Sequence, residues 1–209
     1  SSISDNDIIG HEKLKNFRSE SAINNKKIEL LFLGRVEIDK GIREAIESVY
    51  LLNAKYKMNC RLKIVGPIQH MTENDFQNII NNYSANEFID FIGPVRFDSI
   101  FQFYYKSDYF LMPSYHEGMP KVIWESLSQG TPVISTRVGG IDSFLDHEKE
   151  IFFVEKRSSD SIAKAVVHLE KNIKKRNSLI INGLKKVRNF TKERQGKLLY
   201  QFTKDFINR

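Results

Sequence analysis

The sequence contains a single cysteine, Cys60, which excludes an internal disulfide and a zinc site built from several cysteines. No apolar run approaches the roughly 18 residues that a transmembrane helix requires, and the longest runs, 28–33 and 109–112, are of strand length. The first twenty residues are polar and show no signal peptide. These absences predict a cytoplasmic protein, and hydrophobic residues at 41% supply enough apolar side chains for a folded core.

Positive charge is concentrated near the C-terminus. Residues 161–209 contain 13 Lys and Arg against three Asp and Glu, whereas the whole chain has a net charge of +6. This segment could be a solvated helix face, a docking surface for a partner domain, or a peripheral contact with an anionic membrane at its inner face. Nucleic-acid binding is not expected, because the sequence shows no nucleic-acid recognition motif and the nearby aromatic residues fall at helix-core spacing.

Short apolar runs alternate with amphipathic stretches along most of the chain. After residue 41, apolar side chains recur at three- and four-residue steps, which is helical spacing, and Thr72 with Asp75 indicates a further helix start. Strands are predicted at 28–33, 61–65, 88–92, 109–112, 132–136 and 151–154. Helices are predicted at 41–56, 72–83, 98–106 with Asp98 as the cap, between Pro120 and Gly130, and at 160–172, 174–189 and 192–208.

This order of elements predicts the fold class. Strands separated by helices pair in parallel through right-handed crossovers, and strands without polar alternation are buried on both faces. We therefore predict an α/β protein with a doubly wound, parallel, six-stranded, Rossmann-like sheet and a C-terminal helical tail. Residues 1–26 are predicted to be a linker or tail, and residues 27–209 a single domain whose C-terminal helices begin at about 160.

Two cations follow the first predicted strand, and they mark a candidate binding site. Arg35 and Lys40 are bracketed by Gly34 and Gly41. In an open doubly wound sheet, ligands bind beyond the carboxyl ends of the strands. A diphosphate there would meet backbone amides at a helix N-terminus, a planar guanidinium and an ammonium group. Glycine before a helix is also common in ordinary turns, so a purely structural turn stays open.

Two glutamates flank the helix that begins near Pro120. Glu117 lies in the preceding loop and Glu125 in the second helical turn, so both can point into one cleft. Carboxylates accept hydrogen bonds from vicinal hydroxyls, and the pair therefore suits a nucleotide sugar. The alternative is that each glutamate only stabilises the helix N-terminus. A glycosidase pair is disfavoured, because the nearby cations would then have no task.

A set of motifs resembles one known family, the retaining GT-B glycosyltransferases of the group 1 or family 4 type. The similarity covers their C-terminal, nucleotide-sugar-binding domain and extends from about residue 28 to residue 154. It implies that residues 27–209 form a GT-B C-terminal donor-binding domain. The motifs are GR at 34–35, KG at 40–41, PSYHEG at 113–118 followed by Glu125, GTPVI at 130–134 and VGG at 138–140.

The resemblance implies a hexosyltransferase-type enzyme of surface-polysaccharide or glycan biosynthesis. This chain would be its donor-binding half, with a UDP- or GDP-sugar as donor and no cofactor or metal. Arg35 and Lys40 would bind the diphosphate and Glu117 the donor sugar, as the catalytic residues. Glu125 would accept hydrogen bonds from the ribose. The other donor-binding residues that it implies are Gly34, Gly93, Val95, Gly118, Met119, Pro120 and Lys121.

Complete enzymes of this kind also have an acceptor-binding N-terminal domain. The resemblance therefore implies a missing N-terminal domain, in cis or in trans, without which the isolated chain is inactive. The alternative is a non-catalytic nucleotide-sugar-binding subunit that works with a separate N-terminal-domain partner. The chain departs from the family pattern at Pro67 and at Asp142–Ser143, so contacts from these two loops are not expected.

Overall fold

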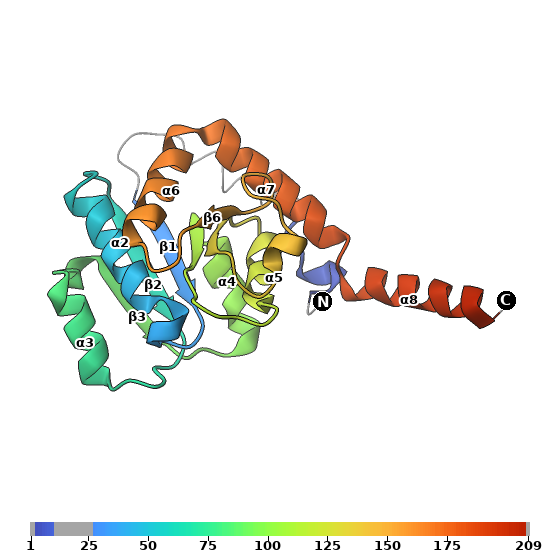
Figure 1. Cartoon of the computed structure of the whole chain (residues 1–209), viewed down its shortest axis with the longest axis horizontal. Coiled ribbons are helices and arrows are strands. Elements are labelled where there is room, and N and C mark those ends of the chain that lie inside the picture. The colour runs from blue at the N-terminus through green and yellow to red at the C-terminus, as the bar shows by residue number, and fades with distance from the viewer. Residues whose placement is uncertain (1–2, 11–26, 208–209) are drawn as a thin grey trace.

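The computed structural model describes residues 3–10 and 27–207 of the chain. The apolar runs form six parallel strands in the order β3-β2-β1-β4-β5-β6, and the order reverses between β1 and β4 (Figure 1). The predicted doubly wound, six-stranded parallel sheet is confirmed. The strands are β1 Ile28–Leu33, β2 Cys60–Val65, β3 Ile89–Gly93, β4 Tyr109–Met112, β5 Val133–Thr136 and β6 Phe152–Val154.

The α-helices begin and end within about two residues of the expected positions. One expected cap is wrong: Asp98 lies in a 3-10 turn before α4, and its carboxylate accepts hydrogen bonds from the side chains of Arg96 and Ser99. Pro120 is the N-cap residue of its helix. The α-helices are α2 Ile42–Ala54, α3 Glu73–Asn82, α4 Ile100–Tyr105, α5 Lys121–Ser128, α6 Ser159–Lys171, α7 Ile173–Arg188 and α8 Lys192–Ile207.

Helices cover both faces of the sheet, and each face has its own core. Successive strand residues point to opposite faces, so Leu30 packs with apolar side chains of α2, α3 and α6, whereas Leu31 packs with those of α4 and α5. All of β1 lies in register with β2, from Ile28 opposite Cys60 to the last residue of each strand. A sheet buried on both faces leaves its loop edges as the accessible polar surface.

The N-terminal segment 3–10 is docked on the domain, which its composition did not indicate. Ile3 is 1% exposed within the α4 and α5 core, and Ile9 packs against Ile180 and Leu184 of α7. Backbone hydrogen bonds join the Ile9 N–H to Ser128 and the Lys192 N–H to Ile3, both at 2.9 Å. The rest of the predicted linker or tail, 1–26, lies outside the described residues.

Helix α8 projects from the body of the domain (Figure 1). Its apolar side chains at Leu198, Leu199, Tyr200 and Phe202 are 57–70% exposed. Within residues 3–10 and 27–207, no helix combines the length and the apolar character that a membrane span demands.

Candidate active site

Three loops meet closely at the carboxyl end of the sheet, because glycine occupies two of the contact points. A Cβ atom at Gly41 would lie 2.3 Å from the Pro113 carbonyl oxygen, and one at Gly139 would lie 1.7 Å from the Gly118 carbonyl oxygen. Both glycines also have a positive φ, 73° and 64°, which L side chains rarely adopt. The loops after β1, β4 and β5 are therefore held together by backbone contact.

Lys40 and Glu117 contact each other where these loops meet. The Lys40 Nζ lies 2.7 Å from Glu117 Oε1, and the two side chains are only 17% and 16% exposed. The Ser114 hydroxyl donates to the same oxygen at 2.8 Å. An ammonium group carries three donors, so Lys40 can also bind an anion beside Glu117. The N-terminus of α2 begins directly after this lysine, and its backbone amides favour negative charge.

Arg35 lies on the same loop with a different partner. Its guanidinium is 3.0 Å from Glu37, whose side chain is 8% exposed, while the arginine side chain is 49% exposed. Glu37 also faces the ring of His70 from the loop after β2, at 3.6 Å. The arginine is thus anchored at one side and open to solvent at the other, which suits an anion-binding side chain.

Glu125 has surroundings unlike those of Glu117. It is 5% exposed on α5 and accepts a hydrogen bond at 3.1 Å from the hydroxyl of Tyr104 on α4. Burial raises the pKa of Glu125, and the Tyr104 hydrogen bond and the charge of Lys121 only partly oppose this. Glu117 by contrast has a cation in direct contact.

The four charged residues of the predicted site are therefore not all joined by contacts. Between described residues, a direct contact unites Lys40 and Glu117, whereas Arg35 and Glu125 have separate partners. The convergence of all four on one ligand stays a prediction.

The other predicted donor-binding residues also lie in loops or at element ends on this edge of the sheet. The Gly34 N–H donates to the Val65 carbonyl at 3.0 Å, and the Gly66 N–H to the Gly93 carbonyl at 2.9 Å. The Val95 side chain packs against the α4 and α5 core. Gly118, Met119 and Lys121 are exposed around the start of α5, where Pro120 is buried.

Two further residues of this region were missed by the sequence reasoning. The Tyr115 hydroxyl donates to Glu44 of α2 at 2.6 Å, and the Tyr115 N–H donates to the Asp39 carbonyl at 2.8 Å. Tyr115 lies inside the PSYHEG motif, which could have marked it. Glu44 follows no motif, since only the fold brings the first turn of α2 against the loop after β4.

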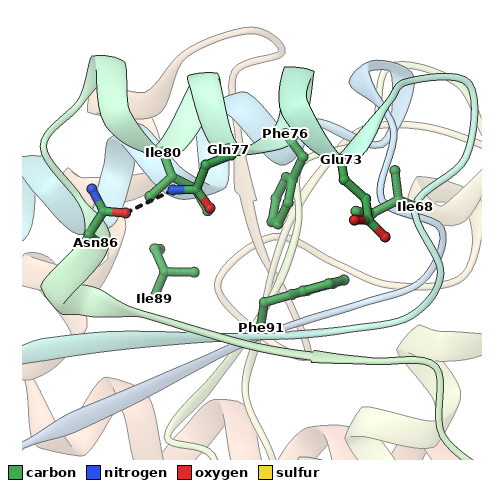
Figure 2. A pocket seen from close by; sticks show the side chains of 8 residues that line it. All are labelled: Ile68, Glu73, Phe76, Gln77, Ile80, Asn86, Ile89 and Phe91. Atoms are coloured by element: carbon green, nitrogen blue, oxygen red, sulfur yellow. Dashed lines mark hydrogen bonds between the residues drawn. The ribbon is translucent and has the colours of Figure 1, made fainter.

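Two cavities of the described surface lie away from the predicted site. One cavity, of about 310 Å³, lies between α3 and β3, where the Gln77 side-chain amide donates to Asn86 at 2.9 Å. Figure 2 shows the side chains that line it. A second cavity, of about 320 Å³, lies beside β6 and α6. Neither is lined by a residue of the predicted site. The first is lined by Ile68, Glu73, Phe76, Gln77, Ile80, Asn86, Ile89 and Phe91.

No group of three or more metal-ligating side chains that could hold a metal ion occurs in the described part of the chain. Asp5 and Asp7 form an Asp-x-Asp triplet, a pattern that can bind a cation. The Asp7 carboxylate accepts hydrogen bonds from the N–H and the hydroxyl of Ser4, at 2.7 and 3.0 Å. It therefore serves as a local cap.

Comparison with known proteins identifies the family. The family model described as glycosyl transferases group 1 matches residues 14–186. The chain belongs to this family. It is 27% identical over 155 residues to an uncharacterized glycosyltransferase of Methanocaldococcus jannaschii, which covers 74% of the chain and 39% of that protein. It is 28% identical over 169 residues to the Staphylococcus aureus capsular polysaccharide biosynthesis glycosyltransferase CapM, covering 79% of the chain and 42% of CapM.

Solved structures share the fold. The C-terminal domain of the group 1 glycosyl transferase LpcC from Francisella tularensis matches with a TM-score of 0.73 at 20% identity, over 88% of this chain and 96% of that one. Anabaena HepE, solved with UDP and glucose, matches with a TM-score of 0.80 at 15% identity, over 98% and 55%. The group 1 glycosyltransferase chain therefore has the GT-B C-terminal, Rossmann-like fold, and it spans about two fifths of the curated relatives above.

Proposed function

We propose that this chain is the donor-binding part of a retaining glycosyltransferase of the family 4 type. It would use a UDP- or GDP-sugar, without a metal, in surface-polysaccharide or glycan biosynthesis at the cytoplasmic side of a membrane. The observation that carries the proposal is the Lys40–Glu117 pair at the carboxyl end of the sheet, within the residues matched to the family. The role of CapM and the UDP bound to HepE support the pathway and the donor class.

The proposed chemistry follows from charge. When the bond between the anomeric carbon and the diphosphate breaks, negative charge grows on the departing phosphate oxygens. Lys40 and Arg35 would stabilise this charge, a task that a metal ion performs in other enzymes. Glu117 would bind hydroxyls of the sugar and so hold the anomeric carbon in place. The acceptor oxygen would then bond to that carbon on the face that the diphosphate left, and the departing phosphate oxygen would take up the proton of the acceptor hydroxyl.

Calorimetry with UDP and GDP tests the site directly. We expect dissociation constants between about 1 μM and 1 mM, or about −8 to −4 kcal/mol. In Lys40→Ala, affinity should fall about tenfold to a hundredfold, because a charge-assisted contact of roughly 1.5–3 kcal/mol is lost.

A matched control is Lys63→Ala. Lys63 lies 3.0 Å from Glu29, and its side chain is 25% exposed, so this substitution also removes a lysine from a partly buried ion pair. It should leave nucleotide affinity unchanged. Absence of binding by the wild type, or equal losses in the two variants, would contradict the proposed donor site.

Helix α8 supports the proposal that an N-terminal domain acts together with this chain. Its exposed apolar residues, Leu198, Leu199 and Phe202, belong to a helix that projects from the domain, and the chain spans only part of its relatives. Such a face is usually covered by a partner. We expect the isolated chain to bind nucleotide but not to transfer sugar until an N-terminal domain is supplied, in cis or in trans.

Two measurements distinguish half of an enzyme from a non-catalytic subunit and test the membrane contact. If an N-terminal domain restores sugar transfer, the chain is half of an enzyme; if it binds tightly without restoring transfer, the non-catalytic subunit is the better description. A peripheral membrane contact predicts that sedimentation with anionic vesicles increases with anionic lipid content and falls with salt. Vesicles that do not sediment the chain at low salt would exclude the membrane contact.

A further inference from the structure

Arg157 has a backbone conformation that its side chain disfavours. It lies between β6 and α6 with a φ of 55°, in the left-handed region where glycine is the usual residue. Its guanidinium carbon lies 4.7 Å from the centre of the Tyr115 ring. Glycine would form this turn without strain. The arginine at this position, with its contact to Tyr115, therefore indicates a role for the side chain.

Tyr115 connects Arg157 to a buried acid. Tyr115 is 7% exposed, and its hydroxyl donates to Glu44 Oε1 at 2.6 Å. Glu44 is also 7% exposed, and its Oε2 is buried without a hydrogen-bond partner among residues 3–10 and 27–207. Tyr115 thus donates a hydrogen bond to this carboxylate. The positive charges of Arg157 and Arg43 lie close enough to interact with the Tyr115 side chain.

The same tyrosine also joins the two loops of the candidate site. Its N–H donates to the carbonyl of Asp39, the residue before Lys40. Its chain neighbour Ser114 donates to Glu117. The position of Tyr115 therefore sets the relative position of the loop that carries Lys40 and the loop that carries Glu117.

We propose that Arg157, Tyr115 and Glu44 form a clamp that positions Lys40 and Glu117 for donor binding. Arg157 is a positioning residue. Its solvent-exposed guanidinium packs on the Tyr115 ring, while Glu44 of α2 accepts the hydrogen bond from the Tyr115 hydroxyl. The inference rests on the proposed donor function, because it assigns these residues to the same site. A buried tyrosine with contacts at both its ring and its hydroxyl restricts the loop before a ligand binds. Binding then costs less conformational entropy.

Arg157→Gly separates positioning from folding. Glycine adopts a φ of 55° without strain, so the turn itself should persist. The matched control is Lys57→Gly, which replaces another non-glycine residue of left-handed φ, 54°, between α2 and β2 at the opposite edge of the sheet. We expect Arg157→Gly to raise the dissociation constants of UDP and GDP about fivefold, the size of one cation–π contact, and Lys57→Gly to leave them unchanged.

Hydrogen exchange provides a second readout that needs no nucleotide. The Tyr115 amide should exchange faster in Arg157→Gly and in Tyr115→Phe, which removes the hydroxyl but keeps the ring, and should not change in Lys57→Gly. Unchanged exchange at this amide in Arg157→Gly would overturn the clamp, whatever the nucleotide data show. If exchange rises but the wild type binds no UDP or GDP, the loop clamp stands and the proposed donor function fails.

Discussion

Two ion pairs of similar chemistry hold different parts of the molecule. At the carboxyl end of the sheet, Lys40 contacts Glu117 between two loops, at 2.7 Å. Under the helices, Arg176 of α7 contacts Glu170 of α6 at 2.7 Å, and the hydroxyl of Tyr109 from β4 donates to the same oxygen at 2.5 Å. The Arg176 side chain is 3% exposed, against 17% for Lys40.

The difference lies in what holds each pair. The Arg176 guanidinium is buried, and Glu170, whose side chain is 22% exposed, is contacted from both α7 and β4, so helices and a strand of the core fix this pair. The lysine pair joins loops whose backbones touch, and its ammonium keeps hydrogen-bond donors for a ligand. We infer that the surrounding elements, more than the ion-pair distance, decide whether a pair maintains the fold or is able to bind a ligand.

Removing the enclosed arginine should have the largest effect. Arg176→Ala leaves Glu170 without its cation, and we expect the free energy of unfolding to fall by about 3 kcal/mol. Urea denaturation measures it. The control Arg61→Ala breaks a more exposed pair with Asp90, with side chains 38% and 29% exposed, and should cost less than about 1 kcal/mol. The nucleotide affinity of folded Arg176→Ala should stay at the wild-type value. A large loss of affinity would contradict the assignment of this pair to the fold alone.

The contact between loop backbones can be tested with two adjacent glycines. Gly139 and Gly140 both have positive φ, 64° and 66°, but only a Cβ at Gly139 would meet the Gly118 carbonyl. Gly140→Ala should cost about 1 kcal/mol of stability, from conformation alone. We expect Gly139→Ala to cost about 1–2 kcal/mol more and also to weaken nucleotide binding, because the loop that carries Glu117 must move. Equal stabilities and affinities of the two variants would contradict a role for this contact.

The smallest effect concerns Glu125 and pH. Burial raises its pKa in the folded state above the ordinary value of 4.5, so the folded protein binds more protons than the unfolded chain just above that value. This acid therefore contributes stability at low pH that is lost as pH rises through the folded pKa. In Glu125→Gln, the stability gain over wild type should grow from pH 4.5 toward neutral pH, as thermal unfolding at several pH values would measure. A gain that does not depend on pH would contradict this account.

Much of the fold was readable from short apolar runs. Strands such as 28–33 and 109–112 are buried on both faces, so they lack polar alternation and stand out from amphipathic helices. The segment 3–10 escaped prediction because its apolar residues, Ile3, Ile8 and Ile9, are few and show no helix or strand periodicity. Their burial depends on α7 and on the core of α4 and α5, which lie far away in the sequence.

The candidate site was readable only in part. The motifs that follow two strands place Lys40 and Glu117 on the same side of the sheet, because carboxyl ends of parallel strands share one edge of a sheet. The Tyr104 partner of Glu125 depends on how α4 packs against α5, and the Arg157 contact with Tyr115 depends on a left-handed turn. No pattern in the sequence predicts the angle at which α4 packs against α5, or the positive φ of Arg157.

Hydrophobic periodicity and the order of motifs along the chain were enough to predict the parallel sheet, the family and the loops that carry the charged residues. Which of these charges touch depends on the folded arrangement. Contacts such as Lys40 with Glu117, or Tyr115 with Glu44, join residues more than seventy positions apart. Their distances are set by backbone approach at glycine and by helix packing, which arise only once the whole sheet has formed.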